Sequence, residues 1–298
     1  METKEQLMGH VCSKFISKYG NKPEFIGSVP GRINIIGEHT DYNDGLAMPA
    51  AIDRWICVAA SRSDGDHSSI YSLNYNTNIT LSQNENVDIK EVWMKLAKTS
   101  LDVLRLEFSI HHEITIALGG NIPIGCGLSS SSAFVISLAY AFCSLFSINV
   151  KGKTLAKLCH KIENSALGTA GGLLDQYGII LSKINHCMVI DFHDDTMEYV
   201  PISSNECSWI VVNSCIQREL SESAYFERVN EGREGFKFLK NKFNIKSIRD
   251  INNSMLKALI LGNKNLHDRL THVMEENIRV NEMRSVLEKG DAIQVGLI

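Results

Sequence analysis

The chain has 298 residues, of which 44% are hydrophobic and 21% charged, so it can bury substantial cores and does not have the composition of a disordered protein. Its net charge is -4 and it contains no basic run or arm. These properties exclude a broad nucleic-acid surface and a basic membrane surface, and any anionic ligand must be held by local donors.

The first predicted element is an amphipathic helix over residues 5–19, where Leu7, Val11 and Phe15 recur at helical spacing. Apolar runs then predict strands, and apolar residues at helical spacing predict helices. The strands are expected at Ala47–Ala60, Glu113–Leu118, Cys187–Asp191 and Trp209–Asn213, and the helices at Trp93–Leu106 and Thr154–Ala166. An uncharged stretch, Ala133–Val150, is expected to be a buried core helix, because its serines and the loop before it do not suit a membrane span.

The second part of the chain is predicted to be more helical. Charged helices are expected at Ala224–Lys240, Asn253–Leu261 and Leu266–Leu287. This change in character predicts a mixed α/β domain over residues 1–195 and an α+β domain over residues 196–298.

The chain is expected to be cytoplasmic. It opens with the mixed charges of Met1–Glu5 and lacks the apolar segment of a secretory signal. Its eight cysteines are scattered, without metal-ligand spacing, and most lie among apolar residues. We therefore expect reduced structural thiols.

The first of three motifs lies in residues 30–45 and places Arg32, Glu38, His39 and Asp41 directly after a short apolar strand. Carboxylates accept hydrogen bonds from hydroxyl groups, and arginine donates in a fixed fork, so this cluster suits a polyhydroxylated ligand. A solvated turn held by ion pairs would account for the same residues.

The second motif, residues 121–133, carries two glycines and a run of four serines before the uncharged helix. Glycines permit close backbone approach, and a helix N-terminus offers unpaired N–H groups, so the segment can hold phosphates. It is neither a Walker A loop nor a GxGxxG loop. Ordinary helix capping remains an alternative.

The third motif, residues 163–178, places the carboxylate of Asp175 among apolar residues after a glycine-rich turn. Burying a carboxylate is costly unless a cation pairs with it, so an arginine or lysine partner is expected. Capping of the next helix is the alternative role for Asp175.

Together the three motifs resemble the GHMP sugar and isoprenoid kinases, and among them the galactokinases. Residues 31–43 nearly reproduce the galactokinase motif, and Pro123–Ala133 is similar to the phosphate-binding motif, with Ser132 where an alanine is usual. Glu163 and the segment Gly172–Gln176 resemble the part that carries a metal-side glutamate and a catalytic aspartate. A fourth similarity lies at Asn213–Ser214 and Leu220–Arg228, and a fifth, weaker one lies at His272–Val280.

The resemblance implies a two-domain α+β fold, with an S5-like N-terminal domain and a ferredoxin-like C-terminal domain. It implies ATP-dependent phosphorylation of a sugar, galactose, at its C1 hydroxyl, with Mg²⁺ as the metal and with a monomeric protein. Asp175 and Arg32 are the implied catalytic residues, and Ser130 and Glu163 the implied metal ligands. The implied sugar-binding residues are Glu38, His39, Asp41, Gly172 and Tyr225. The implied ATP-binding residues are Gly125, Gly127, Leu128, Ser129, Ser130 and Ser131.

Two alternatives remain open at this point. The chain could be a non-catalytic sensor that binds galactose and ATP, or a related kinase acting on N-acetylgalactosamine, galacturonate or arabinose. The sequence ends at Ile298 without the family's third, glycine-rich motif, so the C-terminal domain is expected to be incomplete, as a fragment or a natural truncation. The chain alone is then expected to be poorly soluble or weakly active.

Overall fold

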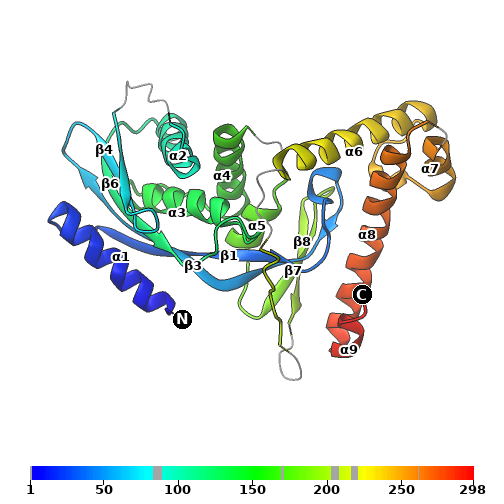
Figure 1. Ribbon diagram of the computed structural model, residues 1–298, viewed down its shortest axis with the longest axis horizontal. Coiled ribbons are helices and arrows are strands. Elements are labelled where there is room, and N and C mark those ends of the chain that lie inside the picture. Colours follow the sequence, from blue (N-terminus) through cyan, green and yellow to red (C-terminus); the bar gives the residue numbers. More distant parts are fainter. Residues whose placement is uncertain (1, 83–88, 169–170, 203–207, 216–220, 261) are drawn as a thin grey trace. The chain divides into compact units, whose positions relative to one another are not determined.

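The computed structural model describes residues 2–82, 89–168, 171–202, 208–215, 221–260 and 262–298 (Figure 1). The chain forms two compact units. The first comprises Met1–Arg32, Ile52–Thr169 and Asp175–Leu181, and the second comprises Ile33–Ala51, Ala170–Leu174 and Ser182–Ile298. This division follows packing and does not test the sequence-based boundary near residue 195, which stays a prediction.

A five-stranded sheet forms the centre of the first unit, with strand order β1-β3-β6-β4-β5. The strands span Phe25–Asn34 (β1), Pro49–Ser63 (β3), Glu113–Gly120 (β6), Ser68–Ser72 (β4) and Thr77–Leu81 (β5). β3 pairs antiparallel with β6, and β4 lies parallel to β6 on its other side. The strands predicted at Ala47–Ala60 and Glu113–Leu118 are thereby confirmed in type and approximate position.

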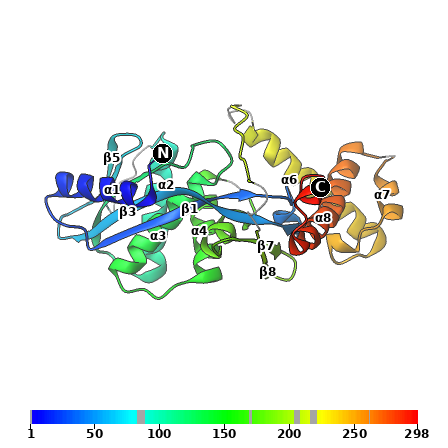
Figure 2. The same ribbon diagram turned by 90° about the horizontal axis from the view of Figure 1, so that it is seen from below.

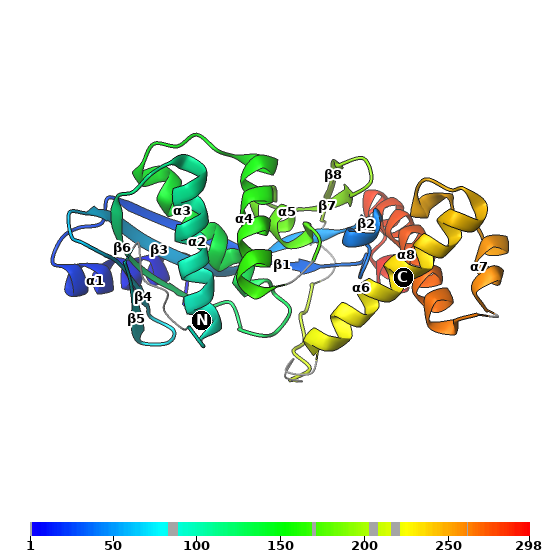
Figure 3. The same cartoon turned by 90° about the horizontal axis from the view of Figure 1, so that it is seen from above.

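Helices cover both faces of this sheet (Figures 1, 2 and 3). On one face lie α2 (Val92–Phe108), α3 (Ser130–Leu145) and α4 (Gly152–Leu167), and on the other lies α1 (Lys4–Tyr19). Successive side chains of β3 point to opposite faces, so Val58 packs in the core beneath α2–α4 while Cys57 packs beneath α1. Because both faces are covered, the sheet is apolar on each side.

The uncharged segment is confirmed as a core helix. α3 is buried along most of its length, and its apolar residues pack against the sheet and the neighbouring helices. In the part of the chain that the structure describes, no helix is both long and apolar enough to cross a membrane.

The second unit contains a three-stranded sheet in the order β2-β7-β8, formed by Leu46–Ala47, His186–Asp191 and Thr196–Pro201. α8 (Lys264–Lys289) packs Val280, Met283 and Leu287 into a core with residues of this sheet. The N-terminal half of α8 packs in a further core with α6 (Ser221–Phe243) and α7 (Asn253–Ile260). The short helix α9 spans Ala292–Val295. The helices predicted over Ala224–Lys240, Asn253–Leu261 and Leu266–Leu287 are confirmed, although Leu261 lies outside the described residues.

The strand predicted at Trp209–Asn213 is wrong. Residues 208–215 form no strand, and the side chains of Ile210 and Val212 are 81% and 83% exposed. A strand requires a neighbouring strand for its backbone groups, and residues 208–215 belong to neither of the two sheets that the structure describes. High β-propensity therefore did not produce a strand here.

Among the residues that the structure describes, four cysteines are buried as free thiols. Cys57, Cys143 and Cys159 lie in the first unit and Cys187 in the second. Burial raises the pKa of Cys57 to about 12 and that of Cys187 to about 11. The expectation of reduced structural thiols is confirmed for these four side chains, while Cys207 lies outside the described residues.

Candidate active site

The glycine-serine loop of the first unit takes a conformation that its glycines permit. Gly125 and Gly127 both have φ of +73°, in the left-handed region that residues with a side chain rarely adopt. The loop is tied to the end of β1, because the Arg32 backbone N–H donates to the Leu128 carbonyl at 3.2 Å and the Arg32 Nη1 donates to the Gly127 carbonyl at 2.7 Å. A Cβ on Gly31 would lie 2.8 Å from the Leu128 carbonyl oxygen, so glycine is needed there too.

The loop leads into the N-terminus of α3 without a side-chain cap. Ser129 is the N-cap residue, but its side chain makes no capping hydrogen bond. Its Oγ is buried and has no hydrogen-bond partner among the described residues. The first N–H groups of α3 and the Ser129 hydroxyl are therefore available to an anionic ligand, as the phosphate interpretation requires.

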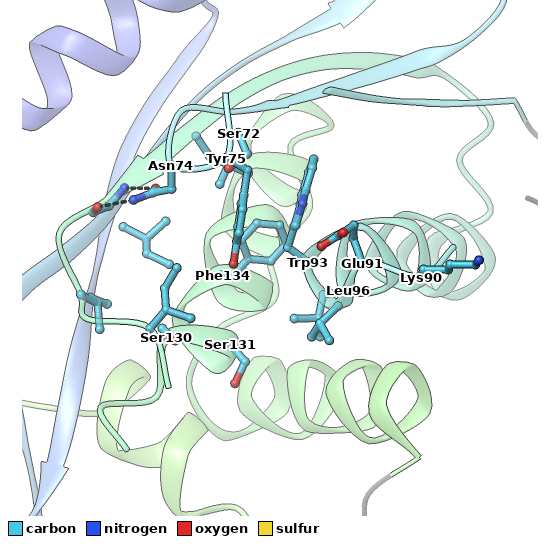
Figure 4. A pocket seen from close by; sticks show the side chains of 16 residues that line it. Ser72, Asn74, Tyr75, Lys90, Glu91, Trp93, Leu96, Ser130, Ser131 and Phe134 are labelled. Atoms are coloured by element: carbon cyan, nitrogen blue, oxygen red, sulfur yellow. Dashed lines mark hydrogen bonds between the residues drawn. The ribbon is translucent and has the colours of Figure 1, made fainter. Parts of the chain in front are cut away.

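An apolar pocket of about 420 Å³ lies beside the start of α3, within the first unit (Figure 4). The rings of Tyr75 and Trp93 stand nearly parallel in it, with an interplanar angle of 9° and centroids 5.6 Å apart. Ser130 and Ser131 line the pocket at its α3 end. A flat aromatic ligand could thus lie beside a group that binds the helix N-terminus.

Asp175 has the basic partner that the sequence predicted. It lies in the first turn of α5 (Leu174–Ile180), and its Oδ1 accepts a hydrogen bond from Arg32 Nε at 2.9 Å and a second from Nη2 of the same guanidinium. The Arg32 side chain is largely buried, which strengthens the pairing relative to a surface ion pair.

A second carboxylate, Glu163 of α4, is buried close to Asp175. The hydroxyls of Ser131 and Ser132 and the amide of Gln176 all hydrogen-bond to it, the last two at 2.7 Å. Burial raises the pKa of Glu163, and the neighbouring charge of Asp175 raises it further. No salt bridge to Glu163 is present among the described residues.

These features fit a divalent cation held by few protein groups. A cation would offset the cost of two neighbouring carboxylates, of which only Asp175 has a guanidinium partner. The described residues contain no cluster of three or more His, Cys, Asp or Glu side chains suited to a metal. Magnesium is commonly held by one or two carboxylates together with substrate oxygens and water, which agrees with such a sparse set.

The second unit contains the other predicted loop, Gly37–Gly45. Gly37 has φ of +99°, and a Cβ there would lie 2.5 Å from the Ala47 Cα, so the turn requires glycine. The buried Thr40 hydroxyl contacts the carbonyls of Gly37 and Leu46 at 2.8 and 2.7 Å. These contacts fold the loop so that Asp41, in a short 3₁₀ helix (Asp41–Asn43), lies next to Gly172.

Gly172 leaves room for the Asp41 carboxylate, because a Cβ at this glycine would overlap it. At the neighbouring glycine, a Cβ would lie 3.3 Å from the Tyr225 hydroxyl. Asp41, Gly172 and Tyr225, which are far apart in the sequence, thus gather within the second unit. Glu38 is exposed, and its Oε1 accepts a hydrogen bond from Asn34 at 3.0 Å.

His39, Tyr42 and Tyr225 form an aromatic group in the same unit. The His39 Nδ1 lies 2.5 Å from the Tyr42 hydroxyl, and the His39 and Tyr42 rings each have their centroid 5.7 Å from that of Tyr225. Burial lowers the pKa of His39 to about 4, assisted by nearby cationic groups, foremost Arg228. The imidazole is therefore neutral near pH 7.

Helix α8 holds the Gly37–Gly45 loop in place. Glu276 Oε1 accepts hydrogen bonds from the backbone N–H groups of Gly37 and Glu38 at 2.8 and 3.0 Å. The Asn277 side-chain oxygen accepts from the Leu46 N–H at 2.7 Å, and His272 Nε2 lies 2.8 Å from the Glu38 carbonyl oxygen.

The predicted site residues fall into two groups. Arg32, Asp175, Glu163 and the Gly125–Ser131 loop lie in the first unit. The second unit contains the residues predicted to bind the sugar, Glu38, His39, Asp41, Gly172 and Tyr225.

Sequence reasoning missed Ser132, Gln176 and Glu276. The resemblance covers His272–Val280 without giving this segment a role. In the structure its buried Glu276 accepts hydrogen bonds from backbone N–H groups of the Gly37–Gly45 loop. Ser131 and Ser132 contact Glu163 in the structure, and the assignment of Ser130 to a metal stays a prediction. Leu220, part of another noted similarity, lies outside the described residues.

Comparisons with known proteins agree with this geometry. Residues 13–62 match the model of the galactokinase galactose-binding signature, and residues 92–183 match that of the N-terminal domain of GHMP kinases. The galactokinase of Roseiflexus sp. (strain RS-1) is 31% identical, over 97% of this chain and 74% of that protein. The galactokinase of Thermotoga maritima is 33% identical, over 90% of this chain and 73% of that protein.

A solved structure is also closely similar. The crystal structure of Lactococcus lactis galactokinase complexed with galactose has a TM-score of 0.88 and 28% sequence identity, over 97% of this chain and 76% of that one. The mixed α+β fold expected from the resemblance is thereby confirmed. By sequence and by structure, this chain belongs to the galactokinase family of GHMP kinases.

Proposed function

We propose that this protein transfers the γ-phosphoryl group of ATP to the C1 hydroxyl of galactose. The observation that carries the proposal is the Arg32–Asp175 pair beside the uncapped start of α3. In this pair the Asp175 carboxylate lies close to backbone N–H groups that suit phosphates. Phosphoryl transfer needs positioning and charge stabilisation more than covalent chemistry, and this arrangement can supply both.

In this proposal the nucleotide occupies the first unit. The base lies in the apolar pocket against Tyr75 and Trp93, and the phosphates lie along the Gly125–Ser131 loop. The Ser129 hydroxyl, which lacks a partner among the described residues, would then donate to a phosphate oxygen. The N–H groups at the start of α3 would face negative charge at the positive end of the helix dipole.

A magnesium ion fits the buried carboxylate of Glu163, with Ser130 or Ser131 as the hydroxyl ligand. When bound there, it would neutralise charge on the phosphate oxygens. Ser131 already hydrogen-bonds to Glu163, which supports it as the better placed of the two hydroxyls.

Asp175 would accept, or orient, the proton of the C1 hydroxyl as the oxygen attacks. Its Oδ1 is occupied by Arg32, so Oδ2 is the oxygen that carries the free capacity for this proton. Arg32 orients the Asp175 carboxylate through these hydrogen bonds, and the same guanidinium holds the phosphate loop through the Gly127 carbonyl.

The second unit would bind the sugar. The carboxylates of Asp41 and Glu38 can accept hydrogen bonds from sugar hydroxyls, and a site built on such bonds rejects ligands that invert or lack them. The neutral imidazole of His39 and the Tyr225 hydroxyl add polar atoms to an aromatic surface. The galactose in the similar L. lactis structure supports galactose as the substrate.

The experiment is an assay of ADP release with galactose, glucose, N-acetylgalactosamine, galacturonate and arabinose. Galactose is expected to exceed glucose by at least about a hundredfold in kcat/KM. Asp175→Asn should abolish turnover, and Asp102→Asn, an exposed aspartate on α2, is the matched control. Binding of galactose and ATP without turnover would identify a sensor, and equal rates on galactose and glucose would reject the galactose assignment.

A further inference from the structure

The Ser132 hydroxyl lies between the two carboxylates of the site, and nothing in the proposed function uses it. Ser132 is fully buried in α3, and its Oγ lies 2.7 Å from Glu163 Oε2 and 3.4 Å from Asp175 Oδ2. The motif that this segment resembles usually has alanine at the same position. The hydroxyl is thus a feature of this chain, and its location calls for an explanation.

The hydroxyl has one proton and can donate it fully to only one carboxylate. The shorter distance assigns the donation to Glu163, since 3.4 Å is long for an O–H···O bond. The Oγ also accepts a long hydrogen bond from Gln176 Nε2 at 3.5 Å. The Ser132 hydroxyl therefore lies between the two carboxylates and contacts both.

The remaining contacts restrict both carboxylates further. Glu163 Oε2 also accepts from Gln176 Nε2 at 2.7 Å, so two donors hold this one oxygen. Ser131 also hydrogen-bonds to the same carboxylate. Arg32 occupies Oδ1 of Asp175, and Oδ2 faces Ser132. In each carboxylate, protein donors thus hold one oxygen. The other oxygen is the one that the proposed function assigns to the cation or to the sugar hydroxyl.

We propose that Ser132 is a positioning residue that fixes the orientation of Glu163 and its separation from Asp175. With Oε2 held by Ser132 and Gln176, Oε1 is directed to the cation, and Asp175 Oδ2 is left to the sugar hydroxyl. The proposal deepens the proposed kinase function and rests on it. It concerns how the side chains of the site are held, and it assigns no new chemical step.

A packing role is the competing explanation, and α3 supplies a matched control. Ser137 is also fully buried in α3, but its hydroxyl donates to the Phe134 carbonyl at 2.7 Å and contacts neither carboxylate. Ser137→Ala removes a buried helix hydroxyl without touching the site. Any effect common to Ser132→Ala and Ser137→Ala therefore belongs to the helix.

The test measures the Mg²⁺ dependence of ADP binding by calorimetry, in the absence of sugar, for the wild-type chain, Ser132→Ala, Ser132→Cys and Ser137→Ala. We expect Ser132→Ala to raise the Mg²⁺ concentration for half-maximal ADP binding about threefold to tenfold, because a hydrogen bond to a buried charged group is lost. Ser132→Cys, which keeps a weak donor of similar size, should lie in between. Ser137→Ala should match the wild type.

Turnover gives a second readout. Ser132→Ala should lower kcat about tenfold to a hundredfold and change the KM for galactose less than about threefold, since positioning acts mainly on the transition state. Equal behaviour of Ser132→Ala and Ser137→Ala in both measurements would overturn the proposal. If Ser132→Ala does not fold, Ser132→Cys decides: a shifted Mg²⁺ requirement supports the proposal, and an unshifted one overturns it. A wild-type chain without galactose turnover would count against the proposed function, while the binding measurement would still test Ser132.

Discussion

Glu276 is predicted to be the main stabiliser of the sugar-binding loop, and replacing it with glutamine tests this. Its Oε1 accepts from two backbone N–H groups, of Gly37 and Glu38, and its Oε2 pairs with Arg279. The side chain is 8% exposed, so solvent screens these bonds little. The glutamine amide can keep one acceptor on the loop, but it loses the charge that strengthens all three contacts.

The expected cost follows from these contacts. Hydrogen bonds to a charged group contribute about 1.5–3 kcal/mol each, and glutamine retains part of that, so we expect a loss of about 2 kcal/mol. In a chain of this size, 1 kcal/mol corresponds to roughly 2–4 °C in Tm, which gives a decrease of about 4–8 °C. The loop carrying Asp41 should also loosen, and the KM for galactose should rise more than the KM for ATP.

The pH dependence supplies a further check on the same residue. Burial alone would raise the pKa of Glu276, but the hydrogen bonds from Glu38, Gly37 and Arg279 outweigh it and lower the pKa below the ordinary value of 4.5. Because the folded-state pKa is the lower one, the stabilisation is present above about pH 4.5 and is lost as the pH falls toward the folded-state pKa. The stability difference between wild type and Glu276→Gln should therefore narrow on acidification.

The assay is thermal melting at pH 7 and at pH 4, with galactose KM measured at pH 7. Glu275→Gln is the control. Glu275 is half exposed, and its closest approach to Arg279 is 3.8 Å, which is too long for a hydrogen bond. If the two glutamine variants had the same Tm and the same galactose KM, the assignment of Glu276 to the loop would be refuted.

Three other predictions follow from the site. Gly172→Ala should raise the KM for galactose at least about tenfold by displacing Asp41, whereas Gly9→Ala, where a Cβ meets nothing within 4 Å, should leave it unchanged. Trp93→Ala should weaken ADP binding and leave galactose binding intact; the reverse pattern would remove the base from that pocket. Asp175→Asn should remove turnover while galactose affinity, measured by calorimetry, stays within about tenfold, and normal turnover would disprove its role.

Much of the first unit was predictable because its signals are local. The Leu7–Val11–Phe15 spacing identified α1, and the uncharged run identified α3 as a core helix. A basic partner of Asp175 could be predicted because a buried carboxylate needs a cation, and the fold shows Arg32 in contact with it.

The missed features depend on contacts between distant residues. In the sequence, Ser132 is one more serine in a run at the start of a helix. Its contacts are with Glu163 and Asp175, which lie 31 and 43 positions away. From the sequence alone, Glu276 resembles an ordinary surface glutamate. Its contacts appear only in the fold, where the loop from Gly37 to Gly45 packs against α8. The strand prediction at Trp209–Asn213 failed for a related reason. The composition of this segment favours a strand, but a strand also needs a place in a sheet, which the local sequence does not show.

The buried thiols have a practical consequence: alkylation of the folded protein should report how often each unit opens. Only an exposed thiolate reacts, and burial keeps Cys57 and Cys187 protonated as well as shielded. Their labelling rates then measure transient opening, in the manner of amide hydrogen exchange. Because Cys57 lies in the first unit and Cys187 in the second, mass spectrometry of the labelled peptides would read the stability of the two units separately in one sample. Galactose and nucleotide, added in turn, should each slow the labelling of the unit that binds it.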